Sequence, residues 1–257
     1  MASYWSNKVV LVTGASSGIG RGLAVELARR GAAVGLLARR ADTLQEVVAE
    51  IKAGGGRALA LPADVTDSNA VSQAADVLRT EFGPIDVLFA NAGVGGTAHA
   101  AKLEPAEFAG VIDVSVKGVV NSVTAVIGDM IKREQGQLVV ISSLSAYRGL
   151  PKSAAYCSSK AAVSAFFESM RLDLHGSGVD VTIIHPGFIK TPLTAGRKAR
   201  LPWLMELGYA VDKILKATEA RKKSYAFPWQ LATIVRAGMI MPIFMYDWIA
   251  RRNSFRE

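Results

Sequence analysis

The chain has 257 residues, of which half are hydrophobic and only 20% are charged, and its mean hydropathy is +0.25. A chain of this size and composition can bury a large core, which excludes a wholly disordered protein. Its single cysteine cannot form an internal disulfide, so nothing in the composition requires an oxidising compartment. The first apolar run, 9–12, is too short for a signal peptide, and a cytoplasmic protein is therefore expected.

The net charge of +8 is concentrated near the C-terminus. Residues 197–257 contain twelve Lys and Arg against five Asp and Glu, which is a local excess of seven positive charges. The basic residues are interspersed with apolar residues rather than with aromatic side chains arranged to stack on bases, so no nucleic-acid partner is expected. The three histidines, His99, His175 and His185, lie far apart without cysteine or carboxylate neighbours at ligand spacing. No metal site is expected.

Short β-branched runs alternate with longer segments of helical period, which predicts βαβ units and a parallel sheet. Strands are expected at Val9–Thr13, Ala33–Ala38, Ala58–Leu61, Val87–Ala90, Leu138–Ser142, Val179–His185 and Ser224–Phe227. Helices are expected at Ile19–Arg30, Thr43–Ala53, Asn69–Phe82, Ala106–Arg133 and Ala155–Gly176. The chain should form one α/β domain, a doubly wound Rossmann-type fold with a parallel sheet of about seven strands, followed by an apolar C-terminal helical extension.

A glycine-rich loop follows the first expected strand directly and leads into a helix. Its sequence is TGASSGIG, residues 13–20. Glycines there permit a tight turn and a close approach of a pyrophosphate, while the helix N-terminus offers free N–H groups to the phosphates. The strand, loop and helix context favours dinucleotide binding over a plain glycine-rich turn. The candidate binding residues in this loop are Gly14, Ser16, Ser17, Gly18, Ile19 and Gly20.

Arg39 and Arg40 stand at the end of the second expected strand, where an acidic residue would accept hydrogen bonds from an adenosine ribose. An arginine guanidinium is a planar donor fork suited to a phosphate. These residues therefore predict NADP(H) as the cofactor rather than NAD. The alternative is a solvated pair of charges at a strand end.

Tyr156 and Lys160 lie one helical turn apart at the start of an expected helix. An ammonium beside a phenol stabilises the phenolate and lowers its pKa toward the range useful for proton transfer. The Tyr-x-x-x-Lys pattern alone is common by chance. Ser143 adds weight to it, because this residue follows the preceding strand at the sheet edge where ligands bind.

This combination of motifs resembles the short-chain dehydrogenase/reductase family over residues 7–192. The resemblance implies hydride transfer between a nicotinamide and a carbonyl or hydroxyl group. Tyr156 would protonate the carbonyl oxygen, Lys160 would hold the nicotinamide ribose and lower the pKa of the tyrosine, and Ser143 would hydrogen-bond the carbonyl. Homodimers or homotetramers are usual in the family, so a homo-oligomer is expected.

The same resemblance assigns further cofactor contacts. Asp64 and Val65 would contact the adenine, and the run from Asn91 through Ala92 to Gly93 would support the central strand and the cofactor. The nicotinamide-side loop would contain Pro186, Gly187, Ile189 and Thr191. Without the family context, Asp64 can equally cap a turn, and residues 91–93 can be a tight turn.

One position departs from the family pattern. The family usually has an asparagine that holds a water in a proton relay to the lysine, and Ser115 occupies that position here. A hydroxyl binds water but lacks the paired donor and acceptor of an amide. We expect a working but altered relay through Ser115. The departure also motivates an alternative, a non-catalytic NADP-binding regulatory protein on the same fold.

The segment 187–210 is irregular and is expected to cover the nicotinamide as a substrate lid. It contains Phe188, Leu193 and Trp203, and Leu144, Tyr147 and Leu150 follow the serine. These side chains favour a bulky lipophilic carbonyl substrate that is similar to a steroid, a retinoid or a keto-lipid. The alternative is ordinary core packing of the lid.

Residues 228–257 form a very apolar, basic-flanked extension. Between 225 and 250 the only charged residues are Arg236 and Asp247, and the uncharged stretch between them is too short to span a bilayer. A helix here with Trp and Tyr near its ends and basic flanks can lie in a membrane interface. It can instead be a substrate lid or a dimer interface, and the sequence leaves these alternatives open.

Overall fold

The computed structural model describes residues 3–195 and 201–252. Residues 196–200, within the expected lid 187–210, lie outside the described residues. So do residues 253–257, at the end of the expected extension 228–257. The sheet has seven parallel strands in the order β3-β2-β1-β4-β5-β6-β7. The strands are β1 (Val9–Thr13), β2 (Ala33–Ala38), β3 (Arg57–Pro62), β4 (Val87–Ala90), β5 (Gly136–Ile141), β6 (Val179–Pro186) and β7 (Ser224–Phe227).

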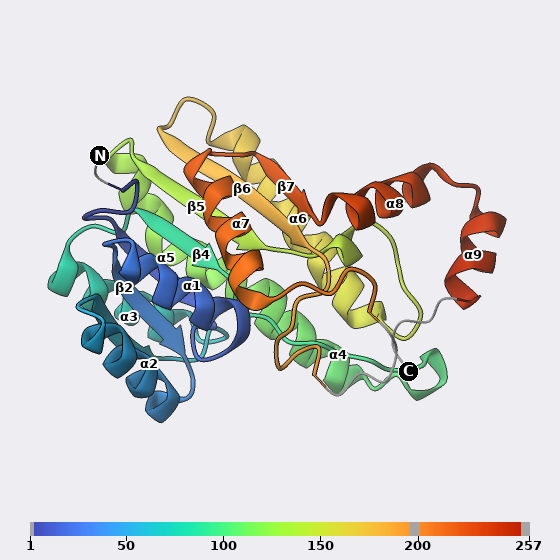
Figure 1. Cartoon of the computed structure of the whole chain (residues 1–257), viewed down its shortest axis with the longest axis horizontal. Helices are drawn as coiled ribbons and strands as arrows, with labels where there is room; N and C mark the ends of the chain where they lie inside the picture. The colour runs from blue at the N-terminus through green and yellow to red at the C-terminus, as the bar shows by residue number, and fades with distance from the viewer. Residues whose placement is uncertain (1–2, 196–200, 253–257) are drawn as a thin grey trace.

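Helices cover both faces of this sheet (Figure 1). The apolar side chains of α1, α2 and α7 bury one face, and those of α3, α5 and α6 bury the other. The α-helices are α1 (Gly18–Arg29), α2 (Ala41–Ala53), α3 (Ser68–Phe82), α4 (Pro105–Ile112), α5 (Gly118–Lys132), α6 (Ala154–Asp173), α7 (Leu207–Glu219), α8 (Trp229–Ile240) and α9 (Ile243–Arg252). The expected doubly wound α/β fold is confirmed.

The sheet has a switch point at its first strand. Strand β1 pairs with β2 on one side and with β4 on the other, so the chain order reverses there. Every residue of β1, β2 and β4 is buried, because helices lie on both faces. Ligands of such sheets bind beyond the carboxyl ends of the strands at this point, and the glycine loop lies there.

Three features differ from the sequence-based expectation. Helix α7 was not expected, although its buried residues follow a helical period. The expected helix 106–133 contains a π-helical turn, Asp113–Lys117, between α4 and α5. The apolar extension is broken into α8 and α9 around Pro242, because a proline lacks the N–H and its ring clashes with the preceding turn.

Most element boundaries lie within one or two residues of the expected ones, and two of the differences concern residues near the site or a helix end. Strand β5 begins at Gly136 and ends at Ile141, so Ser142, expected in the strand, lies just beyond it. Helix α6 ends at Asp173 rather than at Gly176, which has a φ of +83°. That left-handed conformation is one that glycine adopts freely and that cannot continue a right-handed helix.

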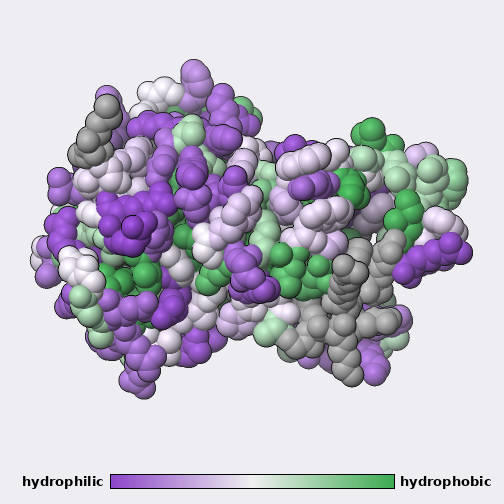
Figure 2. Space-filling model, viewed as in Figure 1, coloured by the Kyte–Doolittle hydropathy of each residue, from purple (hydrophilic) through white to green (hydrophobic). Residues whose placement is uncertain are grey.

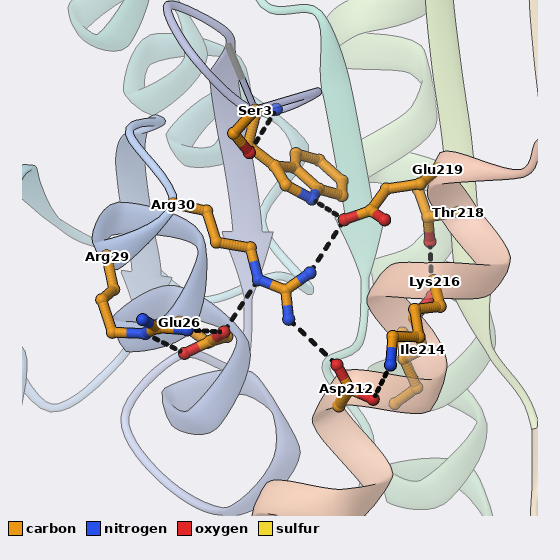
Figure 3. A network of polar contacts seen from close by, with 10 residues as sticks. Ser3, Glu26, Arg29, Arg30, Asp212, Ile214, Lys216, Thr218 and Glu219 are labelled. Carbon is orange, nitrogen blue, oxygen red and sulfur yellow. Dashed lines mark hydrogen bonds and ion pairs between the residues drawn. The ribbon is translucent and has the colours of Figure 1, made fainter. Parts of the chain in front are cut away.

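An ion-pair network joins α1 to α7 (Figure 3). The guanidinium of Arg30 lies 2.8 Å from Glu26, 3.1 Å from Asp212 and 2.8 Å from Glu219. The indole of Trp5, which is fully buried, also donates to Glu219. These contacts tie the N-terminal segment, α1 and α7 together on one face of the sheet.

Within the described residues, one continuous helical stretch, Pro105–Lys132, is long and apolar enough to cross a membrane by length and composition. Its α5 part packs onto the sheet through Val119, Val123 and Val126, as a core helix does.

Candidate active site

A cavity of about 640 Å³ extends along the carboxyl edge of the sheet, from the glycine loop to α8 and α9. Nearly all of the site residues expected from the sequence line it. They are Gly14, Ser16, Ser17, Gly18, Ile19, Arg39, Arg40, Asp64, Val65, Asn91, Ala92, Gly93, Ser143, Tyr156, Lys160, Pro186, Gly187, Ile189 and Thr191. Gly20 and Ser115 do not line the cavity, and both are buried.

The glycine loop has the geometry that a pyrophosphate requires. Gly14 has a φ of +67°, which a residue with a side chain rarely adopts. A Cβ added at Gly20 would lie 2.3 Å from the Gly14 carbonyl oxygen and 2.6 Å from Asn91 Nδ2, so only glycine fits there. The first turn of α1 contains no acidic residue, and its N–H groups begin at the loop. The residues present therefore fit a bound dinucleotide.

Thr13 fastens the loop to the neighbouring strand end. Its Oγ1 accepts the backbone N–H of Asn91 at 3.1 Å and that of Ala92 at 3.0 Å. The side-chain amide of Asn91 donates to the Thr13 carbonyl at 2.9 Å. Thr13 was not among the residues expected at the site. A hydroxyl at the end of an otherwise apolar strand, next to a glycine loop, was the available indication.

Two arginines form the basic end of the cavity. Arg40 donates to Ser16 Oγ at 3.1 Å, and Arg39 lies 3.7 Å from the carboxylate of Asp64. That carboxylate accepts the N–H and the hydroxyl of Thr66, both at 2.9 Å. These Thr66 bonds, with a smaller contribution from Arg39, hold the pKa of Asp64 below its usual value. Asp64 thus caps a turn and also lines the cavity.

Tyr156 and Lys160 are one turn apart in α6, as expected. The Nζ of Lys160 donates to the Ile141 carbonyl at 2.9 Å and lies 5.8 Å from the centre of the Tyr156 ring. Lys160 is buried, and burial lowers its pKa from 10.5 to about 8. An ammonium with this pKa remains largely protonated at pH 7.

The serines after β5 complete the polar centre. Ser143 Oγ accepts the N–H of Ser145 at 3.1 Å and caps a short 3₁₀ turn, Leu144–Ala146. Ser142 Oγ donates to the Lys160 carbonyl at 3.1 Å, which holds α6 against the end of β5. The structure thus brings Ser143, Tyr156 and Lys160 to one cavity from two separate elements.

Ser115 lies in the π-helical turn and is fully buried. Its Oγ accepts the N–H of Val94 at 3.2 Å. A Cβ added at Gly93 would lie 3.3 Å from Lys160 Nζ and 3.5 Å from Ser115 Oγ, so the two polar groups flank Gly93. Ser115 is therefore close to the lysine without reaching the cavity surface.

The other end of the cavity is apolar. Leu144, Leu150, Phe188, Leu193 and Trp203 line it. A further group of lining residues comes from α8 and α9, in the extension for which a substrate lid was one of the alternatives left open by the sequence. They are Leu231, Ile234, Val235, Gly238, Met241, Tyr246, Ile249 and Ala250.

Tyr147, expected at the substrate, instead packs against His185, with their ring centres 4.8 Å apart. His185 is buried at the end of β6, and its Nδ1 lies 3.3 Å from the Ser143 carbonyl. Burial, with a smaller contribution from the nearby Arg236, lowers the pKa of His185 from 6.5 to about 4, against the hydrogen bond to the Ser143 carbonyl, which raises it. The guanidinium of Arg236, from α8, lies over the ring of Tyr147, 5.7 Å from its centre.

Comparison with known proteins decides the family. The family model for short chain dehydrogenase matches residues 8–201. The chain belongs to this family. It is 44% identical over 247 residues to an uncharacterized oxidoreductase of Myxococcus xanthus, a match that covers 96% of this chain and 98% of the relative.

Two solved short-chain dehydrogenases have the same fold. A short-chain type dehydrogenase/reductase from Mycobacterium marinum superposes with a TM-score of 0.80 at 28% identity, covering 93% of this chain and 97% of that one. A short chain dehydrogenase from Mycobacterium paratuberculosis, bound to NAD, has a TM-score of 0.77 at 26% identity, covering 86% and 95%.

The family assignment establishes the class of reaction. The chain is an NAD(P)-dependent oxidoreductase that binds a nicotinamide cofactor and a small-molecule substrate, and its family is generally oligomeric. The Ser115 departure does not outweigh this assignment, so the alternative of a non-catalytic protein is set aside.

Proposed function

We propose that the protein is an NADPH-preferring oxidoreductase of a hydrophobic ketone or aldehyde, reversible as an alcohol dehydrogenase. One observation carries this proposal. A single cavity has the two arginines at one end, Ser143, Tyr156 and Lys160 at its centre, and apolar side chains from α8 and α9 at the other end. These are the surroundings that a phosphorylated dinucleotide, a carbonyl group and a lipophilic body would each need.

At the centre of the cavity, the chain's own residues move one proton and orient one oxygen. Bound reduced nicotinamide supplies the hydride. Ser143 Oγ hydrogen-bonds the substrate oxygen, and the Tyr156 hydroxyl gives that oxygen its proton. The Lys160 ammonium, 5.8 Å from the centre of the tyrosine ring, favours the phenolate left behind. In the reverse direction, the same phenolate accepts the proton of the alcohol.

The NADPH preference rests on Arg39, Arg40 and Ser16. The hydrogen bond from Arg40 to Ser16 and the proximity of Arg39 to Asp64 gather donors beyond the end of β2. A ribose 2′-phosphate in this position would receive charge-assisted hydrogen bonds from both guanidiniums. NADH lacks that phosphate and would gain nothing from them.

The substrate class rests on the apolar end. Side chains from the loop after Ser143, from the segment after β6 and from α8 meet there. Such a surface stabilises a bulky hydrocarbon by removing it from water, at about 25 cal/mol per Å² of apolar area. Small polar ketones would bind in the same place with much lower affinity.

Cofactor oxidation with a panel of ketones tests the proposal. The panel extends from small diketones to steroids and 3-keto-lipids, with NADPH and NADH measured in parallel. We expect turnover to favour NADPH and bulky ketones. Tyr156→Phe should lower turnover by about a hundredfold or more while leaving cofactor binding intact. Equal efficiency with NADH would contradict the cofactor assignment, and a preference for small polar ketones would contradict the substrate assignment.

A further inference from the structure

Helices α8 and α9 expose many large apolar side chains, and Figure 2 shows green patches at this end of the molecule. Ile240 is 89% exposed, Phe244 75% and Ile243 73%. We call the exposed large apolar side chains of the two helices the outer apolar face. Its members are Trp229, Ile234, Met239, Ile240, Ile243, Phe244, Met245, Trp248 and Ile249.

Helix α9 has little to hold it in water. Among the described residues of this helix, Ile243–Arg252, none is buried. An isolated helix shorter than about 12 residues is marginal in water, and most helices are stabilised by packing an apolar face. A covering surface for the outer apolar face would supply that packing.

Helices α8 and α9 are nevertheless anchored to the body of the protein. Arg148 donates to the carbonyls of Gly238 and Met241 at the end of α8, and its guanidinium lies 3.8 Å from the centre of the Tyr246 ring. The Tyr246 hydroxyl donates to the Gly149 carbonyl. The outer apolar face is therefore presented in a fixed position beside the cavity.

The outer apolar face is continuous with the cavity. Ile234 and Ile249 belong to both, since each is exposed and each lines the cavity. An apolar molecule held against the outer apolar face would meet an apolar path to the catalytic centre. A protein partner bound to this face would leave the continuity between the outer apolar face and the cavity without a role.

The charge beside the face indicates what covers it. Residues 228–252 contain three basic residues, Arg236, Arg251 and Arg252, against one acid, Asp247. Arg251 and Arg252 are exposed at the end of α9. Arg251 lies 3.9 Å from Asp247, and the patch still has a net positive charge, which a symmetric dimer would double within one interface. An anionic lipid surface complements both the apolar side chains and the arginines.

We propose that the outer apolar face docks the protein on an anionic lipid surface and admits a membrane-dissolved lipophilic substrate directly into the cavity. The docking step stands on the exposed face alone. The delivery step rests on the proposed function.

Co-sedimentation of the full chain with vesicles tests the docking step. Vesicles of phosphatidylcholine alone are compared with vesicles that also contain phosphatidylglycerol. We expect stronger binding to the mixed vesicles, weakened by salt. Ile240→Ser combined with Phe244→Ser should reduce binding at least tenfold, because both side chains lie on the outer face and outside the cavity lining. Arg251→Glu should reduce binding to the mixed vesicles about fivefold or more.

Leu172→Ser is the matched control, because Leu172 is a 67% exposed apolar residue on α6, outside the outer apolar face. It should leave vesicle binding unchanged. Sedimentation velocity of the wild type and of the double serine variant is measured in parallel. Absence of binding to both kinds of vesicle would overturn the proposal. A wild-type dimer that becomes monomeric in the double variant, without vesicle binding in either, would assign the face to a second copy instead.

Turnover of a small water-soluble ketone separates docking from the proposed function. The double serine variant should retain it, which also shows that the variant is folded. Vesicle binding without turnover of any ketone would leave docking supported and contradict the proposed function. Turnover of lipophilic ketones without vesicle binding would support the proposed function and overturn docking.

Discussion

Helix α7 and the two C-terminal helices, α8 and α9, are all rich in apolar residues, yet they pack differently. In α7, the apolar side chains fall on one face and pack onto α1 and the sheet, and Asp212 and Glu219 on the other side pair with Arg30. In α9, no described residue is buried. Helix α8 uses one side for the cavity and exposes the other.

The difference shows that apolar composition does not by itself make a core. A helix joins the core when its apolar residues form a stripe with a polar counter-face, as in α7. A helix that is apolar on most sides needs two covers. One side of α8 lines the cavity, where a lipophilic substrate would contact it. We propose that a lipid surface contacts the exposed side.

The largest expected effect is on stability, and it contrasts the two regions directly. Ile214 in α7 is fully buried, and Ile214→Ala should lower the free energy of unfolding by about 2–5 kcal/mol. Ile240 is 89% exposed, and Ile240→Ala should change it by no more than about 0.5 kcal/mol. Denaturant titration of the two variants measures the difference. Similar losses at both positions would mean that the outer apolar face is buried in solution.

The next effect concerns the end of β6, where His185 contacts Ser143 and Tyr147 of the segment after β5. Its pKa of about 4 is below the unfolded value of 6.5, so the folded state favours the neutral ring. Stability should therefore fall as the pH drops from 6.5 toward 4, by up to about 3 kcal/mol. His185→Phe should remove this part of the pH dependence. If the free energies of unfolding of the wild type and the variant change in parallel over this range, the pKa of His185 is not lowered by folding.

Cofactor selection should be the third effect, because both arginines are exposed and their charges are partly screened. Arg40→Ala should raise the KM for NADPH about tenfold and leave the KM for NADH nearly unchanged. Arg39→Ala should act in the same direction. Arg57→Ala is a suitable control, since Arg57 is an exposed arginine at the start of β3. Equal changes for both cofactors would place the phosphate elsewhere.

Ser115 should have the smallest effect. Ser115→Ala removes the hydroxyl that accepts the N–H of Val94 beside Lys160, and turnover should fall by a few fold, consistent with about 1 kcal/mol for one hydrogen bond. Ser115→Asn should shift the pH profile of turnover if this position carries protons. An unchanged turnover and pH profile in both variants would remove Ser115 from the relay.

Much of the fold was predictable because its information is local. The β-branched runs and the alternation with helical segments predicted β1 to β7 and most of the helices. Helix α7 was missed because Gly208 and Tyr209 at its start lie next to an irregular stretch, although Val211, Ile214 and Leu215 follow a helical period. The break between α8 and α9 was missed because the uncharged run was considered as a whole, without regard to Pro242.

The candidate site divides in the same way. The glycine loop, the arginines and the Tyr156 and Lys160 pair are short motifs, and the family resemblance that they carry implied one shared site; one cavity does bring them together. The bonds from Thr13 to β4 and the apolar wall formed by Val235 and Met241 depend on contacts between distant parts of the chain. No local pattern predicts such contacts.

The most direct test of the account is the dependence of kcat/KM on chain length for a homologous series of methyl ketones with NADPH. If the apolar end of the cavity receives the substrate, kcat/KM should rise with each added methylene, up to about fourfold per group, until the cavity is filled. A series in which kcat/KM stays flat or falls from the shortest ketone onward would contradict the account.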